Sequence, residues 1–317
     1  MRVAATLGLG LSTRLLRPFA CNSFTGNKVA SWKLGLPASP SDADAILIFG
    51  GDGTVHRHLA QLRELQLPVL VVPCGSGNDF ARALKLRHVR DSIEAWQRFC
   101  SHQDNVRQID LGVISHAPQR DAVAGISTSS LPAEPRSEYF CCVGGVGLDV
   151  EIARRANRLP RWIRRHGGYP LSLLPALARF EPLAVTVQAS QSDGLGALAT
   201  RHPGPAIVVA FANAPAYGGG IKIAPHAQLD DGKLDICVVG NMSKARLLRL
   251  FPSVYSGRHL GIPEVEYFQA ERLRLETEWP TDVYADGEYV CRTPVEVSVQ
   301  RAVLRVIVRR ATSKVSV

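Results

Sequence analysis

Two glycine-rich turns, each carrying an aspartate, lie close together in the first third of this 317-residue sequence. They are Gly50–Thr54 (GGDGT) and Pro73–Asp79 (PCGSGND). Glycine lets backbone N–H groups approach a phosphate closely, and a helix that starts at such a turn adds a favourable partial positive charge. The pair of turns therefore predicts a site that binds the phosphates of a nucleotide. Either turn could also form without a ligand, since Thr54 and Asp79 could each simply cap a helix.

Each turn follows an apolar run of the kind that forms a strand buried on both faces. Ile46–Phe49 precedes the first turn, and Val69–Val72 precedes the second. Helical patterns follow, from Val55 to Leu65 and from Phe80 onward. Loops at the carboxyl ends of adjacent parallel strands form a crevice that binds nucleotides, so the surrounding elements support the same prediction.

Further motifs along the chain occur in an order that resembles the diacylglycerol kinase catalytic family, which includes sphingosine and ceramide kinases and bacterial soluble lipid kinases. The two turns resemble its GGDGT and P-x-GSGNDFAR motifs. Gln108–Gly112 (QIDLG) resembles its strand with a third aspartate. Tyr217–Lys233 resembles its glycine-rich segment and metal loop, and Asp286–Glu288 (DGE) resembles its late acidic motif. The resemblance spans most of the chain.

The resemblance implies an ATP-dependent lipid kinase that transfers the γ-phosphoryl group to a lipid hydroxyl, with diacylglycerol as the default acceptor. Such a transfer needs bound phosphates, a divalent metal ion and a carboxylate that receives the hydroxyl proton. Glu288 is the expected general base, and Asp286 is expected to support it or share its role. The expected nucleotide contacts are Gly51, Asp52, Gly53, Thr54, Ser76, Asn78 and Asp79.

The acidic motifs are expected to hold Mg²⁺, because carboxylate oxygens suit this ion. The resemblance places Asp52, Asp79 and Asp110 together around metal and ordered water near the phosphates. It also places a structural Mg²⁺ at Asp231. By itself, the Asp-Gly pair at this position could be an ordinary hairpin turn, and the same alternative holds for the Asp-Gly pair of the DGE motif. The remaining expected ligands of that second ion are the backbone carbonyls of Gln228 and Lys233.

The alternation of strand, loop and helix predicts an α/β domain over residues 1–112, with a parallel sheet and flanking helices similar to the NAD kinase and diacylglycerol kinase folds. Residues 113–317 predict a β-rich, sandwich-like domain with a helical insert at 150–180 and a helix that starts near Ser243. The tail from about residue 300 is expected to pack back on the first domain. Ala117–Glu138 predicts a flexible excursion. The strand-like runs of the second domain are Tyr139–Val143, Leu183–Ala189, Ala206–Ala212, Leu234–Val239, Arg272–Thr277, Asp282–Tyr284 and Val295–Val308.

The net charge of +9 and the pI of about 9.4 favour anionic partners. Six arginines are interleaved with Trp162 and aliphatic residues, which suits an anionic membrane surface that attracts each arginine by roughly 1 kcal/mol. A solvated basic face is the alternative. Nucleic acid is not an expected partner, because no nucleic-acid-binding motif accompanies these residues. The six are Arg154, Arg155, Arg158, Arg161, Arg164 and Arg165.

Composition excludes several other classes of protein. The seven cysteines show no metal-ligand spacing, which predicts reduced thiols in place of a disulfide framework or zinc site. The apolar run at the N-terminus is too short to span a membrane and has no clear cleavage site. We therefore expect a cytoplasmic protein that associates with membranes peripherally. The identity of the lipid and the oligomeric state, a homodimer included, stay open.

The sequence also departs from the family pattern. Ala5–Ser12 replaces the asparagine-proline-x-serine-glycine loop of many relatives, and His56 and Arg57 follow GGDGT in place of polar and acidic residues. Contacts to the base and ribose are expected to differ accordingly, and the histidines are expected to face solvent or phosphate without binding metal. An NAD kinase-like enzyme and a non-enzymatic lipid sensor on the same fold are the alternative functions. The asparagine-glutamate pair of NAD kinases is not found in this sequence. A non-enzymatic sensor would be expected to have lost its acidic motifs, whereas the acidic motifs of this sequence are intact.

Overall fold

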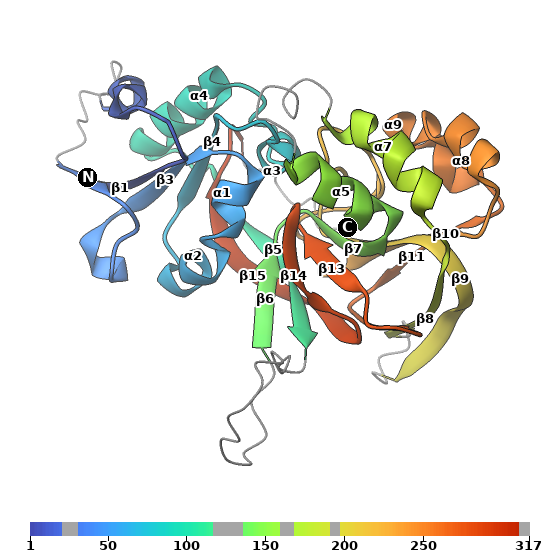
Figure 1. Ribbon diagram of the computed structural model, residues 1–317. Helices are drawn as coiled ribbons and strands as arrows, with labels where there is room; N and C mark the ends of the chain where they lie inside the picture. Colours follow the sequence, from blue (N-terminus) through green and yellow to red (C-terminus); the bar gives the residue numbers. More distant parts are fainter. Residues whose placement is uncertain (21–30, 117–135, 159–167, 191–196, 311–317) are drawn as a thin grey trace, which may run out of the picture.

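The computed structural model describes residues 1–20, 31–116, 136–158, 168–190 and 197–310 (Figure 1). Within these ranges, fifteen strands form one hydrogen-bonded sheet. Its main path runs in the order β14-β13-β7-β9-β8-β12-β15-β4-β3-β1-β2, with β5 and β6 branching from β15, and β10 and β11 branching from β9. The parallel strands lie at one end of this path and the antiparallel strands at the other, as expected for an α/β part followed by a β-rich part.

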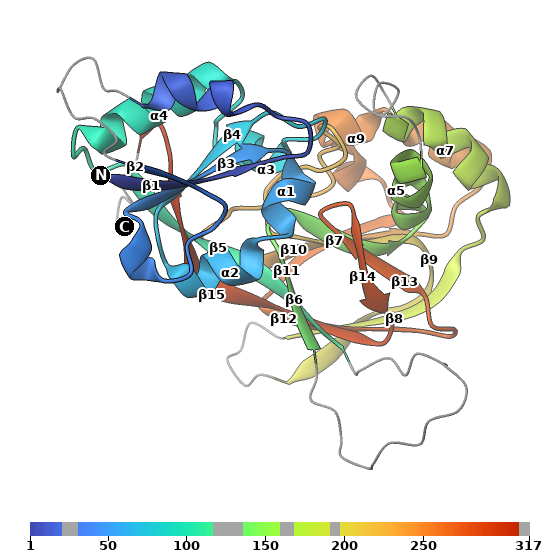
Figure 2. The same ribbon diagram turned by 60° about the vertical axis from the view of Figure 1, so that its left-hand side comes forward.

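The N-terminal part is built on four parallel strands, of which β3 and β4 carry the glycine-rich turns. All six residues of β3 are buried, because helices lie on both faces of the sheet, α4 on one and α2 on the other (Figures 1 and 2). The strands are β1 (Arg2–Leu7), β2 (Ser31–Leu34), β3 (Ala45–Gly50) and β4 (Val69–Pro73). The helices are η1 (Thr13–Phe19), η2 (Pro40–Asp42), α1 (Asp52–His56), α2 (Leu59–Leu65), α3 (Asp79–Ala83) and α4 (Val89–Cys100).

Strands β5 (Val106–His116) and β15 (Val295–Ile307) connect the two parts. They pair antiparallel along most of their length, with an irregularity between Gln300 and Leu304. Before this irregularity β15 also pairs with β12, and after it Val306 pairs in parallel with Val69 of β4. The end of the chain thus returns to the parallel sheet. Strand β5 runs through residue 112, so the domain boundary placed there stays a prediction.

The C-terminal part combines antiparallel strands with a group of helices on one side (Figure 1). The helix expected near Ser243 begins there, and the Ser243 hydroxyl accepts from the Arg246 N–H. The strands are β6 (Arg136–Phe140), β7 (Val143–Gly147), β8 (Leu183–Ser190), β9 (Leu198–Ala212), β10 (Leu234–Gly240), β11 (Val265–Ala270), β12 (Arg272–Thr277), β13 (Asp282–Ala285) and β14 (Glu288–Arg292). The helices are α5 (Leu148–Arg158), α7 (Gly168–Arg179), α8 (Lys244–Leu250), α9 (Ser253–Ser256) and η3 (Arg258–Gly261).

Several elements differ from the sequence prediction. Strand β9 begins at Leu198 and not at Ala206, and β11 and β14 are not among the strands predicted. Two further differences have a clear cause in hydrogen bonding. The helix expected over 55–65 is split into α1 and α2, because the His58 N–H bonds the Val55 carbonyl and so tightens the end of α1. The strand expected over 139–143 is interrupted at Cys141 and Cys142, whose N–H groups bond the Asp286 carboxylate. Most of the expected flexible excursion, residues 117–135, lies outside the described residues.

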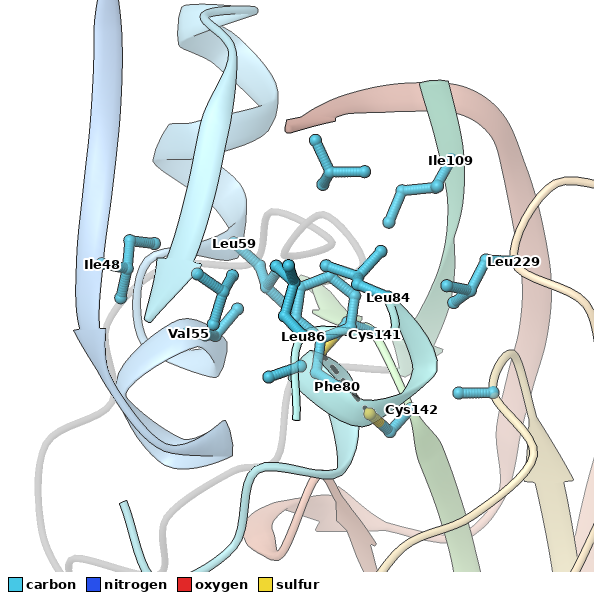
Figure 3. Close-up of a cluster of buried hydrophobic side chains, with 14 of the residues drawn as sticks. Ile48, Val55, Leu59, Phe80, Leu84, Leu86, Ile109, Cys141, Cys142 and Leu229 are labelled. Atoms are coloured by element: carbon cyan, nitrogen blue, oxygen red, sulfur yellow. Dashed lines mark hydrogen bonds between the residues drawn. The ribbon is translucent and has the colours of Figure 1, made fainter. Parts of the chain in front are cut away.

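A shared hydrophobic core holds the two parts together beneath the glycine-rich turns (Figure 3). It joins Phe80 and Leu84, at the second turn and α3, to Cys141, Cys142 and Leu229 of the C-terminal part. All five side chains are buried. A second buried cluster lies wholly within the C-terminal part. Because the larger core crosses the junction, the motifs that meet above it are held by packing from both parts.

Candidate active site

The two glycine-rich turns pack directly against each other at the ends of β3 and β4. A Cβ atom on Gly75 would overlap the Cα atom of Gly51, and one on Gly77 would overlap the Asp52 carboxylate. The Cys74 N–H donates to the Gly50 carbonyl at 3.0 Å. Glycine is therefore required at these positions by the approach of two backbones, independently of any phosphate.

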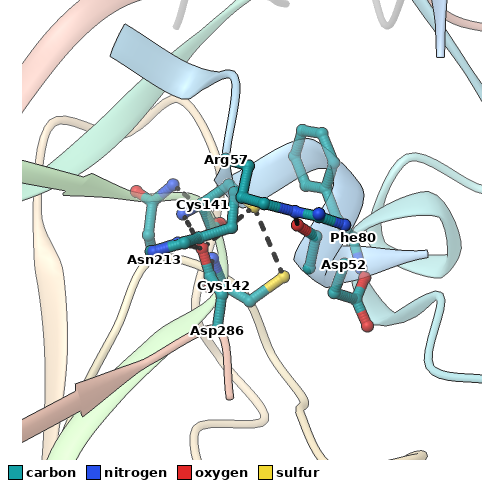
Figure 4. Close-up of polar contacts among 9 residues, drawn as sticks. Asp52, Arg57, Phe80, Cys141, Cys142, Asn213 and Asp286 are labelled. Carbon is teal, nitrogen blue, oxygen red and sulfur yellow. Dashed lines mark hydrogen bonds and ion pairs between the residues drawn. The ribbon is translucent and has the colours of Figure 1, made fainter. Parts of the chain in front are cut away.

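Asp52 organises the second turn from the first. Its carboxylate accepts from the backbone N–H groups of Asn78 at 2.8 Å, Asp79 at 3.0 Å and Phe80 at 3.0 Å (Figure 4). These are donors at the start of α3, which would otherwise have no partner within the helix. Asn78, with a φ of 129°, completes the turn through two hydrogen bonds of 3.0 Å to the backbone of Gly75. The two residues thus fix the shape of the site.

Asp79 joins the second turn to the C-terminal part. Its side chain is buried, forms an ion pair with Arg82 and accepts from the Gly219 N–H at 2.9 Å. Burial and then the nearby charge of Asp52 raise the pKa of the Asp79 carboxyl, and the bonds from Gly219 and Arg82 partly oppose this rise. Gly219 belongs to the glycine-rich segment found in the sequence. The structure therefore brings this segment to the glycine-rich turns.

Asp286 occupies a two-residue hairpin between β13 and β14. The φ values of 52° for Asp286 and 85° for Gly287 suit a type I′ turn. The Asp286 carboxylate has no exposed surface and accepts from the N–H groups of Cys141 at 2.9 Å and Cys142 at 2.8 Å (Figure 4). It also bonds His56 Nδ1 at 3.1 Å. With three partners, Asp286 is placed to hold the hairpin against α1.

His56 is a site residue whose role the sequence did not reveal. Its side chain is 12% exposed, so it does not face solvent, because it contacts Asp286 across the junction. Burial alone would lower the His56 pKa, but the hydrogen bond and charge of Asp286, with the charges of Glu288 and Glu138, outweigh burial and raise it. The one signal in the sequence was its position on the helix that follows GGDGT. The acidic surroundings of His56 therefore favour the charged form of its ring.

Glu288 lies at the first turn. A Cβ atom on Gly53 would lie 2.8 Å from Glu288 Oε1. In contrast to Asp286, Glu288 is exposed. The hairpin thus has one buried acid, Asp286, which bonds backbone N–H groups, and one accessible acid, Glu288, which lies beside the GGDGT turn. An accessible carboxylate is the one of the two that can receive a proton from a substrate.

The remaining predicted nucleotide contacts lie on the same side of the parallel sheet. Ser76 is exposed on the second turn. Thr54 is near Gly8, where an added Cβ atom would lie 3.2 Å from Thr54 Oγ1. The Gly8 N–H also donates to the Phe49 carbonyl at 2.7 Å. The atypical loop over residues 5–12 therefore lies beside the first turn, where its departure from the family pattern can affect ligand binding.

Asp110 bonds backbone groups of two segments of the C-terminal part. Its carboxylate accepts from the N–H groups of Gly232 and Ala302, both at 2.7 Å. Among the described residues, Asp52, Asp79 and Asp110 form no group of three ligands within 4.8 Å of one another. Asp110 instead fixes the expected metal loop to the irregular segment of β15.

Asp231 stands in that loop with one weakly bonded oxygen. Its Oδ1 atom accepts from the Lys233 N–H at 3.0 Å, and its Oδ2 atom accepts from Gln269 at 3.5 Å. Partial burial raises the Asp231 pKa, and the charges of Asp235 and Asp110 add to the rise. A divalent cation bound at Asp231 would offset this repulsion, although Asp110, Asp231 and Asp235 form no group of ligand atoms within 4.8 Å of one another among the described residues. The loop is thus compatible with Mg²⁺ at Asp231 and the flanking carbonyls of Gln228 and Lys233.

Asp149 is a buried acid that the sequence did not single out. It lies at the start of α5, where its Oδ1 atom accepts from the Val150 N–H at 2.9 Å and its Oδ2 atom is 3.5 Å from the Tyr217 hydroxyl. Burial raises the pKa of the Asp149 carboxyl to about 7, and its few hydrogen bonds oppose the shift only in part. Tyr217 begins the segment that contacts Asp79. A carboxyl that titrates near neutral pH therefore lies behind the site.

Known protein families and individual relatives match this chain over most of its length. Residues 29–114 match the diacylglycerol kinase catalytic domain family, and residues 143–308 match the YegS C-terminal NAD kinase beta sandwich-like domain family. A diacylglycerol kinase of Mycobacterium tuberculosis is 32% identical over 270 residues, covering 83% of this chain and 76% of that protein. A diacylglycerol kinase of Bacillus subtilis is 24% identical over 261 residues, covering 82% and 76%.

The fold agrees with these matches. The solved structure of a diacylglycerol kinase from Bacillus anthracis superposes with a TM-score of 0.62 at 19% identity, covering 97% of this chain and 96% of that one. Paired glycine-rich turns on a parallel sheet, joined to a β-rich part, define a kinase of two parts. More narrowly, the chain belongs to the diacylglycerol kinase family. The family and the fold class expected from the sequence are thus confirmed.

The helices of the described residues are too short or not apolar enough for a membrane-spanning role. None of the helices there has both the length and the apolar character that a transmembrane span requires.

Proposed function

We propose that this protein is an ATP-dependent lipid kinase that phosphorylates the hydroxyl group of a diacylglycerol. The observation that carries the proposal is the position of Glu288, an accessible carboxylate beside Gly53 of the GGDGT turn. Phosphoryl transfer to an alcohol requires a proton acceptor next to the phosphate-binding elements. The names of the relatives supply the choice of diacylglycerol as acceptor.

Each group has a distinct task in this proposal. Backbone N–H groups of the two turns, with the hydroxyls of Thr54 and Ser76, bind the phosphates of ATP. Glu288 accepts the proton that the lipid hydroxyl loses as its oxygen attacks the γ-phosphorus. Asp286 is excluded as that acceptor by its burial and its four hydrogen bonds. It therefore positions Glu288 and His56 without reacting.

We propose that Mg²⁺ accompanies the nucleotide and neutralises the charge that develops on the transferred group. Asp79 is the residue that would hold it, because burial and then the neighbouring Asp52 charge raise the Asp79 pKa, and a cation would favour the ionised carboxylate. Asp52 acts on this ion only by shaping the turn, since its oxygens are bonded to backbone N–H groups. A structural Mg²⁺ would be held at Asp231.

We also propose that the enzyme meets its substrate at the cytoplasmic surface of an anionic membrane. The arginines predicted for this contact lend it limited support. Arg154 and Arg155 both form ion pairs with Glu151, whereas Arg158 is exposed. The others, Arg161, Arg164 and Arg165, lie outside the described residues.

A transfer assay with γ-labelled ATP tests the proposal. Diacylglycerol, ceramide, sphingosine and NAD are each offered to the wild-type enzyme, with the lipids in mixed micelles. The expected result is labelled phosphatidic acid formed from diacylglycerol. Label in NAD without any lipid product would overturn the proposal and support an NAD kinase. ATP binding without transfer to any acceptor would support a non-enzymatic sensor.

A further inference from the structure

Helices α7, α8 and α9 and the turn η3 lie together on the side of the C-terminal part away from β1 and β2 (Figures 1 and 2). Lys244 at the start of α8 donates to the Ala178 carbonyl of α7 at 2.8 Å. The rings of Phe251 and Tyr255 contact each other between α8 and α9, 6.0 Å apart. The exposed side chains that these elements share are here called the α7–α9 surface. They are Leu174, Arg179, Leu248, Arg249, Tyr255 and Arg258.

Three of the seven exposed large apolar side chains among the described residues lie on the α7–α9 surface. Leu174 is 62% exposed, Tyr255 39% and Leu248 37%. On α7 the neighbouring Leu173 and Leu177 are buried, so the helix already has a core-facing side without Leu174. Single exposed leucines are ordinary, whereas several large apolar side chains on neighbouring helices are of the kind that marks an interaction site. The surface therefore has the character of a contact site.

The charges on these helices themselves are positive, and the neighbouring acids are Glu181, which is exposed after α7, and Glu264, which pairs with Arg246 of α8. Segments 168–179 and 244–261 contain no aspartate or glutamate. Arg179, Arg249 and Arg258 are exposed among the leucines, and Lys244 lies at the junction of α7 and α8. A surface of one sign repels a second copy of itself and attracts an anionic partner. Exposed apolar residues with cations beside them match the boundary between lipid headgroups and acyl chains.

An apolar recess opens between the same helices. It is a pocket of about 200 Å³ between the end of α7 and the start of α8. Leu177, Phe180, Met242 and Leu247 supply apolar walls, and Lys244 lines it as well. Because the recess combines apolar walls with a cation, a lipid chain with an anionic headgroup suits it better than a polar peptide does.

We propose that the α7–α9 surface docks on an anionic phospholipid membrane. Leu174, Leu248 and Tyr255 enter the boundary of the acyl chains, while Arg249 and Arg258 contact the headgroups. This surface is separate from the arginines of α5, two of which share an ion pair with Glu151. The inference rests on the proposed function, since it names the membrane from which the lipid substrate is drawn.

Co-sedimentation with phospholipid vesicles tests the docking directly. One vesicle preparation contains equal parts of phosphatidylcholine and phosphatidylglycerol, and the other contains phosphatidylcholine alone. The wild type is expected to bind the mixed vesicles at least about tenfold more tightly. Leu248→Glu and Leu174→Glu should each weaken that binding by about tenfold or more, because they remove an apolar contact and add a repelled charge. Arg249→Ala should weaken it about fivefold.

Two control variants make the same types of substitution at exposed positions away from the α7–α9 surface. Leu34→Glu changes a leucine that is 59% exposed on β2, at the far edge of the sheet, and Arg90→Ala removes a cation that is 88% exposed on α4. Both should bind vesicles as the wild type does. Equal binding to the two vesicle types, or no loss in Leu248→Glu, would overturn the inference. A change from dimer to monomer in Leu248→Glu with unchanged vesicle binding would do the same and identify an interface between copies.

Enzyme assays keep this inference distinct from the proposed function. On a dispersed short-chain diacylglycerol, Leu248→Glu should retain wild-type turnover, whereas on mixed vesicles its turnover should fall with its binding. If neither the wild type nor any variant phosphorylates a lipid, the proposed function is wrong. The vesicle-binding experiment still tests the docking surface in that case, because it does not depend on enzyme activity.

Discussion

Replacing Asp286 by alanine is expected to destabilise the protein strongly. The carboxylate has no exposed surface and accepts from the N–H groups of Cys141 and Cys142 and from His56. Alanine would leave two buried N–H groups without a partner, at about 1–3 kcal/mol each, and would remove a charged hydrogen bond worth about 1.5–3 kcal/mol. Such losses overlap, so we expect the free energy of unfolding to fall by about 3–5 kcal/mol.

The size of this loss should depend on pH through His56. The His56 pKa lies above its ordinary value of 6.5 in the folded protein, because the bond and charge of Asp286 outweigh burial. A raised pKa stabilises the fold fully below the unfolded value, and the stabilisation is lost as pH rises through the folded value. The gap in stability between wild type and Asp286→Ala should therefore be largest below about pH 6.5 and should shrink in alkaline solution.

Urea unfolding followed by tryptophan fluorescence over a range of pH measures both effects. Asp282→Ala is the matched control, because Asp282 lies on the same hairpin but pairs with Arg292 near the surface, and its loss should cost at most about 1 kcal/mol. His56→Gln should remove most of the pH dependence of the gap. A loss below about 1 kcal/mol in Asp286→Ala, or a gap that widens as pH rises, would refute the role assigned to this carboxylate.

Three further predictions concern Gly75, Cys141 and Asp149. Gly75→Ala should abolish ATP binding in calorimetry, because the new methyl group would overlap Gly51, whereas Gly261→Ala, with open space around its Cβ, should bind ATP normally. Cys141 should resist iodoacetamide in the folded protein and react only on unfolding, as mass spectrometry can show, because burial raises its pKa to about 12. Asp149→Asn should be increasingly more stable than wild type as pH rises from about 3.8 towards 7 in urea titrations. The raised pKa of about 7 makes ionisation of the native carboxyl costly over that window, and asparagine does not ionise.

Local patterns in the sequence were sufficient to predict the elements that carry the site. Continuous apolar runs before Gly50 and Gly75 correctly indicated buried parallel strands, because such strands are covered on both faces. The serine before the helix near residue 244 likewise predicted a cap that is present. These predictions succeeded because each depends on a few neighbouring residues and one periodicity.

Contacts between distant segments could not be predicted in this way. The Asp286 bonds to Cys141 and Cys142 interrupt a run that reads as a strand, and the partners are 145 and 144 residues apart. His56 gained its role from a residue 230 positions away. The acidic motifs also proved individually ambiguous, since Asp52 and Asp110 bind backbone N–H groups of other loops. A motif shows that an acid is present, whereas only the fold shows which acid remains accessible.

Transfer of label from γ-labelled ATP to diacylglycerol by the wild type and by Glu288→Gln tests the central claim most directly. The exposed, ion-paired Glu271 supplies the control variant Glu271→Gln. We predict labelled phosphatidic acid from wild type and control, and a kcat lowered by about 100-fold or more in Glu288→Gln with ATP affinity retained, since a glutamine cannot accept the hydroxyl proton. Wild-type kcat in Glu288→Gln would contradict the assignment of the base, and transfer to NAD with none to lipid would contradict the function itself.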